Sequence, residues 1–67
     1  MTEKQEKIYN IIKEFINKNS YAPTVREIGE IAKLKSSSTI FEYLRILEDK
    51  GYITSEKGKP RTIRVVK

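Results

Sequence analysis

Four hydroxyl side chains stand in a row at residues 36–39, three serines and Thr39, directly before the apolar sequence IFEYL. Serine is a good helix N-cap but a poor residue inside a helix, because its hydroxyl competes for backbone hydrogen bonds. One cap would start a helix, so the other hydroxyls need a different use. At a helix N-terminus, short hydroxyls can reach phosphates or base edges and let the helix approach closely. The run therefore indicates recognition of a nucleic acid.

A second group of residues with chemical potential is a cluster of cations near the end of the sequence. The chain has 14 Lys and Arg residues against 9 Asp and Glu, a net charge of +5. Residues 52–67 hold five cations and one carboxylate, a net of +4. A phosphate-tracking element needs such a concentration of charge. A solvated basic tail is the alternative interpretation.

Catalysis has almost no support in the sequence. There is no histidine and no cysteine, which removes the commonest catalytic base, the commonest neutral metal ligand and any disulfide. The acidic pairs Glu27/Glu30 and Glu48/Asp49 have the ordinary spacing of a helix surface. We expect no enzyme activity, no metal or other cofactor, and no small-molecule ligand. The lack of cysteines, of a long apolar run and of a signal-type N-terminus favours the cytoplasm, with no membrane partner.

Hydrophobic periodicity predicts the helices that would position these groups. The first helix begins with a capping box formed by Thr2 and Gln5, and the second begins with another formed by Thr24 and Glu27. Apolar residues then recur at helical spacing. Those of the first helix are Ile8, Ile11, Ile12, Phe15 and Ile16. Those of the second are Ile28, Ile31 and Ala32.

The third helix begins among the serines and ends near Gly51, a left-handed stop. Its apolar stripe is Ile40, Tyr43, Leu44 and Leu47. Only three or four residues separate it from the second helix, which is a helix-turn-helix spacing. Gly29 in the second helix is small enough to let a neighbouring helix approach closely.

The segments 52–56 and 61–66 are rich in β-forming residues and flank the turn sequence KGKP at 57–60. A hairpin attached to the last helix of a helix-turn-helix is a wing. We therefore predict a mainly α chain with a small β-hairpin. The fold is a three-helix winged helix-turn-helix of order α-α-α-β-β, in one domain over residues 1–67.

With the apolar stripe of the third helix turned to the core, its outward face carries Ser38, with Thr39 toward the flank. The first residues of such a helix meet base edges in the major groove. Ser38 and Thr39 are therefore candidate base or phosphate contacts. Ser36 is expected both to cap the helix and to contact DNA, whereas Ser37 is expected to turn partly inward and serve only as filler.

Two further residues of this face allow two interpretations each. Phe41 either packs at the rim of the core or meets a thymine methyl group. Glu42 either accepts a hydrogen bond from a cytosine amino group or is a surface charge paired with Arg45 or Lys35. The cations are assigned to the DNA backbone, and the wing should add salt-dependent affinity instead of sequence choice. The backbone candidates are Arg26, Lys35, Arg45, Lys57, Lys59 and Arg61.

The sequence YAPTVREIGEIAKLKSSSTIFEYLRILEDKGYI followed by KPRTIRVV closely resembles the N-terminal DNA-binding domain of the LexA family of SOS-response repressors. The shared features are the PTVREI stretch (23–28), the serine run, the pattern L..LE.KG.I (44–53) and the pattern KPR.I (59–63). The resemblance implies a repressor in the bacterial cytoplasm, at the nucleoid, that binds a palindromic operator in double-stranded DNA as a homodimer. The residues that match the family's base-reading stretch are Ser36, Ser38, Thr39, Phe41 and Glu42.

The chain departs from that family in two places. Lys33 replaces the usual glycine of the turn, which costs about 1 kcal/mol if the residue is left-handed. Phe41 and Glu42 occupy variable positions, which leaves the operator class open. The family's latent self-cleaving protease domain, with its Ser-Lys dyad and main dimer interface, lies beyond this chain. We interpret the chain as an excised domain, monomeric by itself, in preference to a stand-alone relative.

Two other functions compete with sequence-specific DNA binding. A winged helix can dock another protein through its third helix or wing, and it can bind RNA or DNA without sequence preference. A pure protein-interaction module has no need to concentrate a charge of +4 near its wing, so the charge distribution favours a nucleic acid.

Overall fold

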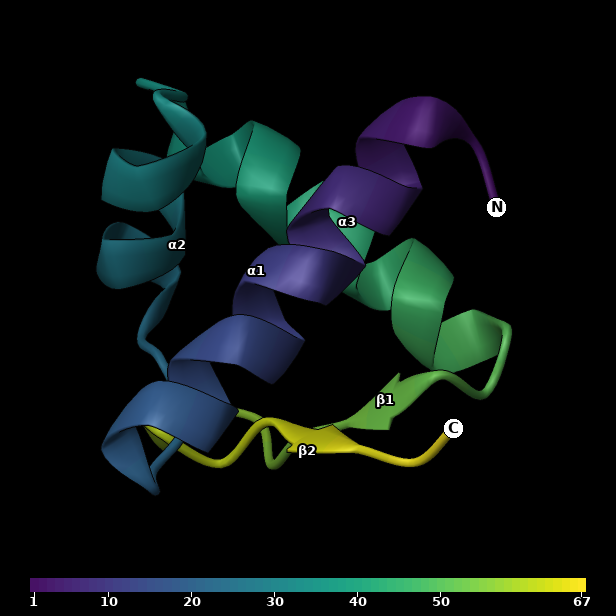
Figure 1. Cartoon of the computed structure of the whole chain (residues 1–67). Helices are drawn as coiled ribbons and strands as arrows, with labels where there is room; N and C mark the ends of the chain where they lie inside the picture. The colour runs from purple at the N-terminus through teal and green to yellow at the C-terminus, as the bar shows by residue number, and fades with distance from the viewer.

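The computed structural model describes residues 1–67 and contains three helices followed by a two-stranded antiparallel sheet (Figure 1). This is the predicted α-α-α-β-β order of a winged helix-turn-helix. None of the helices is long and apolar enough to cross a membrane. The elements are α1 (Glu3–Asn19), α2 (Val25–Ala32), α3 (Ser37–Asp49), β1 (Ile53–Thr54) and β2 (Arg64–Val65).

Both predicted capping boxes are present. The Gln5 N–H donates to Thr2 Oγ1 and the Thr2 N–H donates to Gln5 Oε1, each at 3.2 Å. The Glu27 N–H donates to Thr24 Oγ1 at 3.2 Å, and the Thr24 N–H donates to Glu27 Oε1 at 2.9 Å. A capping hydroxyl typically contributes about 1 kcal/mol. The first two helices therefore begin where their local sequence dictates.

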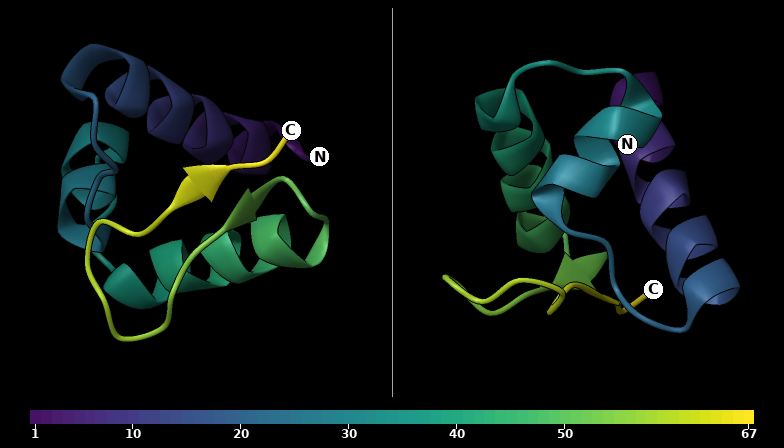
Figure 2. Two further views of the ribbon diagram at one scale, coloured as in Figure 1. Left: turned by 90° about the horizontal axis from the view of Figure 1, so that it is seen from below. Right: turned by 90° about the vertical axis from the view of Figure 1, so that its left-hand side faces the viewer.

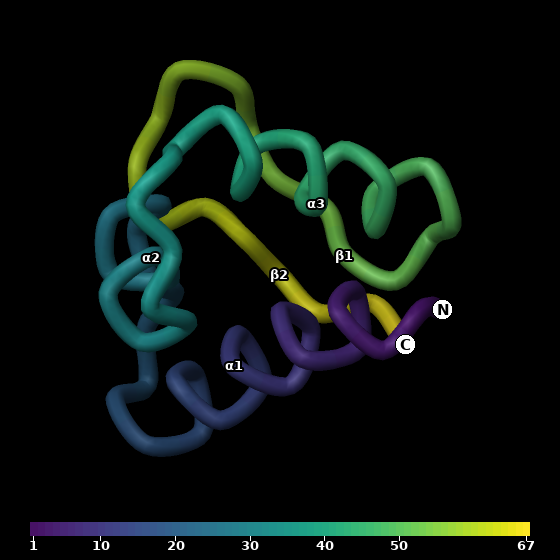
Figure 3. The backbone as a smooth tube through the Cα atoms, turned by 90° about the horizontal axis from the view of Figure 1, so that it is seen from above, coloured from purple at the N-terminus to yellow at the C-terminus, as the bar shows by residue number.

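The core lies where the three helices meet the hairpin, which covers the open side of the helical layer with β1 beside α3 and β2 toward α1 (Figures 2 and 3). It consists of one cluster of eleven buried side chains. They are Ile8, Tyr9, Ile12, Ala22, Ile28, Ala32, Ile40, Leu44, Leu47, Ile53 and Ile63.

One residue predicted for this core is misplaced. The side chain of Ile31 is 49% exposed. The inward face of α2 is formed by Val25, Ile28, Gly29 and Ala32, and Ile31 lies roughly 110° away from the centre of that face on a 3.6-residue helix. The helical spacing of Ile28 and Ile31 was therefore misleading.

The close approach predicted at Gly29 is confirmed. A Cβ atom at this position would lie 2.8 Å from Ile40 Cδ1 and 3.2 Å from the carbonyl oxygen of Leu34. The Gly29 carbonyl also accepts a hydrogen bond of 2.9 Å from the Leu34 N–H, which starts the turn toward α3. The absence of a side chain at Gly29 thus sets how closely α3 crosses α2.

The turn of the helix-turn-helix comprises residues 33–36, in agreement with the predicted spacing. Lys33 adopts the left-handed conformation, with φ 59° and ψ 38°. A non-glycine residue pays roughly 1–2 kcal/mol for this conformation because its Cβ crowds the following carbonyl oxygen.

The hairpin has a shorter ladder than predicted. The predicted strands spanned 52–56 and 61–66, whereas β1 and β2 contain two residues each and pair Ile53 with Val65 and Thr54 with Arg64. On the loop side of these two pairs, a hydrogen bond to a side chain takes the place of backbone pairing: the Glu56 N–H donates to Thr62 Oγ1 at 2.9 Å. Arg61, with φ 59°, also interrupts the extended chain. The resulting loop projects past α3 (Figure 2).

Replacing Lys33 by glycine should stabilise the protein, because glycine adopts φ 59° without the Cβ clash. We expect Lys33→Gly to raise the free energy of unfolding by about 1 kcal/mol in urea titrations followed by circular dichroism. Lys35→Gly is the matched control, since Lys35 lies in the same turn without a positive φ. A loss of stability equal to that of the control would contradict the inferred strain.

Candidate nucleic-acid interface

The hydroxyl run lies on the surface at the start of α3. Ser36, Ser37 and Ser38 are exposed and Thr39 is half-buried. Ser36 occupies the N-cap position, but its side chain makes no capping hydrogen bond, so the expected capping by its hydroxyl is absent. The expectation that Ser37 turns inward is also wrong, because it is the first residue of α3 and no element covers it.

The first turn of α3 is electrostatically open. It contains no acidic residue, whereas α1 and α2 carry Glu3, Glu6 and Glu27 in their first turns. A helix N-terminus with free N–H groups and no local carboxylate attracts anions. The exposed hydroxyls therefore lie on an uncompensated positive helix end.

Phe41 follows the hydroxyls and is 58% exposed, so it is not a core residue. It lines two grooves. The larger groove, of about 850 Å³, lies between α3 and the hairpin loop. The smaller, of about 480 Å³, lies between α2 and α3 and also contains Leu34, Lys35 and Ser37. The exposed aromatic ring of Phe41 thus borders both grooves near the start of α3.

Glu42 and Arg45 form the surface pair that was one of the two interpretations of Glu42. The distance from Arg45 Nη2 to Glu42 Oε1 is 3.9 Å, and both side chains are 69% exposed. Arg26 and Glu30 are similarly loose at 4.0 Å. Exposed ion pairs of this kind contribute 1 kcal/mol or less. Both arginines can therefore exchange their partners for a phosphate at little cost.

The tip of the hairpin loop presents cations without internal partners. Lys57 and Lys59 are exposed and make no ion pair, and Gly58 between them has φ 77°, which turns the chain at the tip. Both lysines line the larger groove together with Arg26 and Arg45. Arg61 lines this groove as well, so the structure brings five of the six cations predicted for the DNA backbone to one groove, and Lys35 lines the smaller groove.

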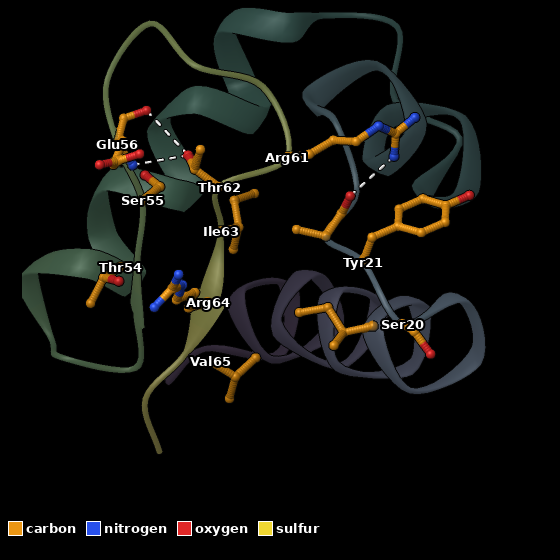
Figure 4. A pocket seen from close by; sticks show the side chains of 12 residues that line it. Ser20, Tyr21, Thr54, Ser55, Glu56, Arg61, Thr62, Ile63, Arg64 and Val65 are labelled. Carbon is orange, nitrogen blue, oxygen red and sulfur yellow. Dashed lines mark hydrogen bonds between the residues drawn. The ribbon is translucent and has the colours of Figure 1, made fainter.

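Arg61 is placed differently from the other predicted backbone contacts. Its Nη1 donates to Glu27 Oε1 at 2.9 Å and to the Ala22 carbonyl oxygen at 3.1 Å, and its Nη2 donates to Glu27 Oε2 at 3.2 Å. The guanidinium also stacks over the ring of Tyr21 at 4.7 Å (Figure 4). The charge of Arg61 is therefore already used within the protein.

Glu27 and Tyr21 contact Arg61 near this interface, and neither contact is predicted from the sequence. Glu27 was assigned only to the capping box, and 34 positions separate it from Arg61. The hydrogen bond from the Thr24 N–H, followed by the hydrogen bond from Arg61, holds the pKa of the Glu27 carboxyl below its ordinary value. No local pattern in the sequence signals this pair.

Comparisons with known proteins agree with this geometry. The family described as the LexA DNA binding domain matches residues 1–62. LexA repressors of Staphylococcus aureus strains Mu3, N315 and MRSA252 are each 48% identical to the chain over 66 residues. These matches cover 98% of the chain but only 32% of each repressor. The chain thus spans about a third of the length of these relatives.

The lowered pKa of Glu27 predicts a specific pH dependence. Its carboxylate stabilises the folded state at pH values above the ordinary value of 4.5, and this contribution is lost as the pH falls through the folded-state pKa. We expect the free energy of unfolding of the wild type to fall more steeply on acidification than that of Glu27→Gln. Urea titrations at a series of pH values would measure both slopes.

Glu30→Gln is the matched control for this experiment, because it removes a carboxylate of the same helix whose cation is 4.0 Å away. It should retain the pH dependence of the wild type. Equal slopes for the wild type and Glu27→Gln would show that the Glu27 contacts contribute nothing to stability.

Proposed function

Because this chain belongs to the family of LexA DNA-binding domains, we propose that it binds double-stranded DNA sequence-specifically, as the operator-binding part of a repressor of the SOS response. The observation that carries this proposal is the exposed, uncompensated N-terminus of α3 with its run of hydroxyls. Phe41 lines both the smaller groove, beside Ser37, and the larger groove, which the unpaired Lys57 and Lys59 also line.

In this proposal α3 enters the major groove and α2 lies across the sugar-phosphate backbone, as in other helix-turn-helix proteins. Ser36, Ser38 and Thr39 then reach base edges or phosphates through hydroxyls that both donate and accept. The small side chains at the start of α3 let its backbone sit deep in the groove. Arg26, on the exposed side of α2, lies within reach of a phosphate.

Phe41 and Glu42 set the choice of bases. An exposed phenyl ring in the major groove has one apolar partner there, the methyl group of thymine. Glu42 can leave its loose pair with Arg45 and accept from a cytosine amino group. Arg45 then turns to a phosphate.

The wing adds affinity through Lys57 and Lys59, and Lys35 contacts a phosphate beside the smaller groove. Such contacts release counterions from DNA and carry little sequence information. One chain binds one half-site of a palindromic operator as a monomer. Pairing of two half-sites depends on the parts of the repressor outside this chain. The whole repressor works as a homodimer in the bacterial cytoplasm, at the nucleoid.

Base contacts and backbone contacts should respond differently to substitution. The probe is a duplex selected by the wild type from a randomised library. We expect Ser38→Ala and Thr39→Ala to reduce the preference for this duplex over a scrambled one by about fivefold each, because one hydrogen bond contributes about 1 kcal/mol. Lys59→Ala should weaken both duplexes alike and lower the slope of log affinity against log salt concentration by about 1.

Fluorescence anisotropy at several salt concentrations measures both quantities. An affinity that neither appears at low salt nor falls with added salt would refute DNA binding and favour a protein partner. Identical behaviour of the three variants would refute the assignment of base reading to the start of α3.

The role of Phe41 is testable on the DNA side. Replacing single thymines of the selected duplex by deoxyuridine removes one methyl group at a time. We expect one such replacement to weaken wild-type binding by roughly fourfold, which corresponds to about 0.8 kcal/mol for a buried methyl group. Phe41→Ala should be insensitive to that replacement, and Phe41→Leu, which remains apolar, should stay sensitive. Equal sensitivity of the wild type and Phe41→Ala at every position would refute the methyl contact.

A further inference from the structure

We propose that Arg61 is a positioning residue and not a phosphate ligand: its paired contact with Glu27 fixes the wing against α2 and sets where Lys57 and Lys59 meet DNA. This inference rests on the proposed DNA-binding function. It concerns the connection between two parts of the interface that are far apart in the sequence.

The geometry of Arg61 is that of an anchor. Its planar guanidinium makes a bidentate contact with the Glu27 carboxylate, with hydrogen bonds of 2.9 and 3.2 Å to its two oxygens, and such a contact fixes direction as well as distance. The same guanidinium also donates to the Ala22 carbonyl and stacks over the Tyr21 ring (Figure 4). Two groups of the segment before α2 and one carboxylate in its first turn thus hold one side chain of the hairpin.

Glu27 is itself held firmly. Its Oε1 accepts from the Thr24 N–H at 2.9 Å, while its own N–H donates to Thr24 Oγ1 at 3.2 Å. The carboxylate therefore belongs to the N-terminus of α2 and cannot follow Arg61 without breaking the capping box. A displacement of the wing must break the Arg61 contact instead.

The hairpin loop has few other connections to the helices. The ladder ends after two residue pairs, and Thr62 bonds only within the loop, to Glu56 and Lys59. At the opposite end of the loop, Ser55 Oγ donates to Glu48 Oε1 of α3 at 2.6 Å. Apart from the buried side chains of Ile53 and Ile63, polar side chains therefore attach the wing at two points, to α3 through Ser55 and to α2 through Arg61.

Arg61 also adopts an unfavourable backbone conformation, with φ 59°. A non-glycine residue keeps a left-handed conformation only when its surroundings require it. The contacts of its side chain with Glu27, Ala22 and Tyr21 supply that requirement. Two exposed lysines at the tip, 57 and 59, depend on the same turn for their position.

The first test needs no DNA. In the free chain labelled with nitrogen-15, Arg61→Lys and Glu27→Gln should lower the heteronuclear NOE of residues 57–59, because lysine lacks the guanidinium fork and the amide lacks the charge. Glu30→Gln is the matched control and should leave these values unchanged. Unchanged values in both Arg61→Lys and Glu27→Gln would overturn the proposal.

The second test uses the selected duplex and a double-mutant cycle. We expect Arg61→Lys and Glu27→Gln each to weaken binding by about tenfold, and their combination to weaken it no further. In a Lys57→Ala/Lys59→Ala background, Arg61→Lys should have no effect on affinity. A phosphate contact made by Arg61 predicts the opposite pattern: Glu27→Gln would strengthen binding, and the effect of Arg61 would persist without the wing lysines.

Loss of stability is separated from positioning in two ways. First, affinities are measured well below the thermal midpoint of each variant. Second, Ser55→Ala removes the hydrogen bond that attaches the loop to Glu48 of α3. This variant should also weaken binding only while the wing lysines are present. An Arg61→Lys effect that survives their removal would overturn the proposal. A wild type that binds no DNA would refute the proposed function, while the NOE measurements would still decide whether Arg61 holds the wing.

Discussion

The contact between α2 and α3 at Gly29 is the constraint on which the rest of the structure depends. A Cβ atom there would lie 2.8 Å from Ile40 Cδ1, a distance that real Cβ contacts do not reach. The crossing brings Ile28 and Ile40 into one buried cluster and leaves the opposite side of α3 outside. A domain of this size buries little more than half of the surface of its unfolded chain, so its core is small. The crossing at Gly29 therefore has a large influence on which side chains enter this core and on which face of α3 remains exposed.

Two capping residues connect local and distant structure. Gln5 Oε1 accepts from the Thr2 N–H and also from Lys50 Nζ, at 3.3 Å, just after α3. Glu27 Oε1 accepts from the Thr24 N–H and also from Arg61 Nη1. Each side chain that starts a helix thus also holds a segment that arrives much later in the chain. The pattern adds long-range contacts without adding buried polar groups that lack partners.

Charge is divided between structural and exposed uses. Arg61 forms a close pair with Glu27, whereas Arg26 and Arg45 have only loose, exposed partners and Lys57 and Lys59 have none. This division follows from solvation. A paired and partly covered guanidinium contributes to the stability of the fold. An exposed ammonium at a loop tip is screened by water, so it can bind a phosphate without loss of folding stability. The proposed DNA interface therefore consists of the cations that the fold does not use.

Local chemistry in the sequence was enough to determine where α1 and α2 begin, much of the apolar face of α1 and α3, and the presence of a basic hairpin. Capping boxes and helical periodicity act over a few residues, so they can be recognised without the fold. Only the tertiary structure decided the exposure of Ile31, the short β-ladder and the partner of Arg61. These depend on which surface meets which: α2 turns its Gly29 side to α3, Thr62 replaces backbone bonds in the loop, and Glu27 comes within 2.9 Å of a residue 34 positions away. No periodicity or spacing in the sequence encodes such contacts, because they form between segments that only folding brings together.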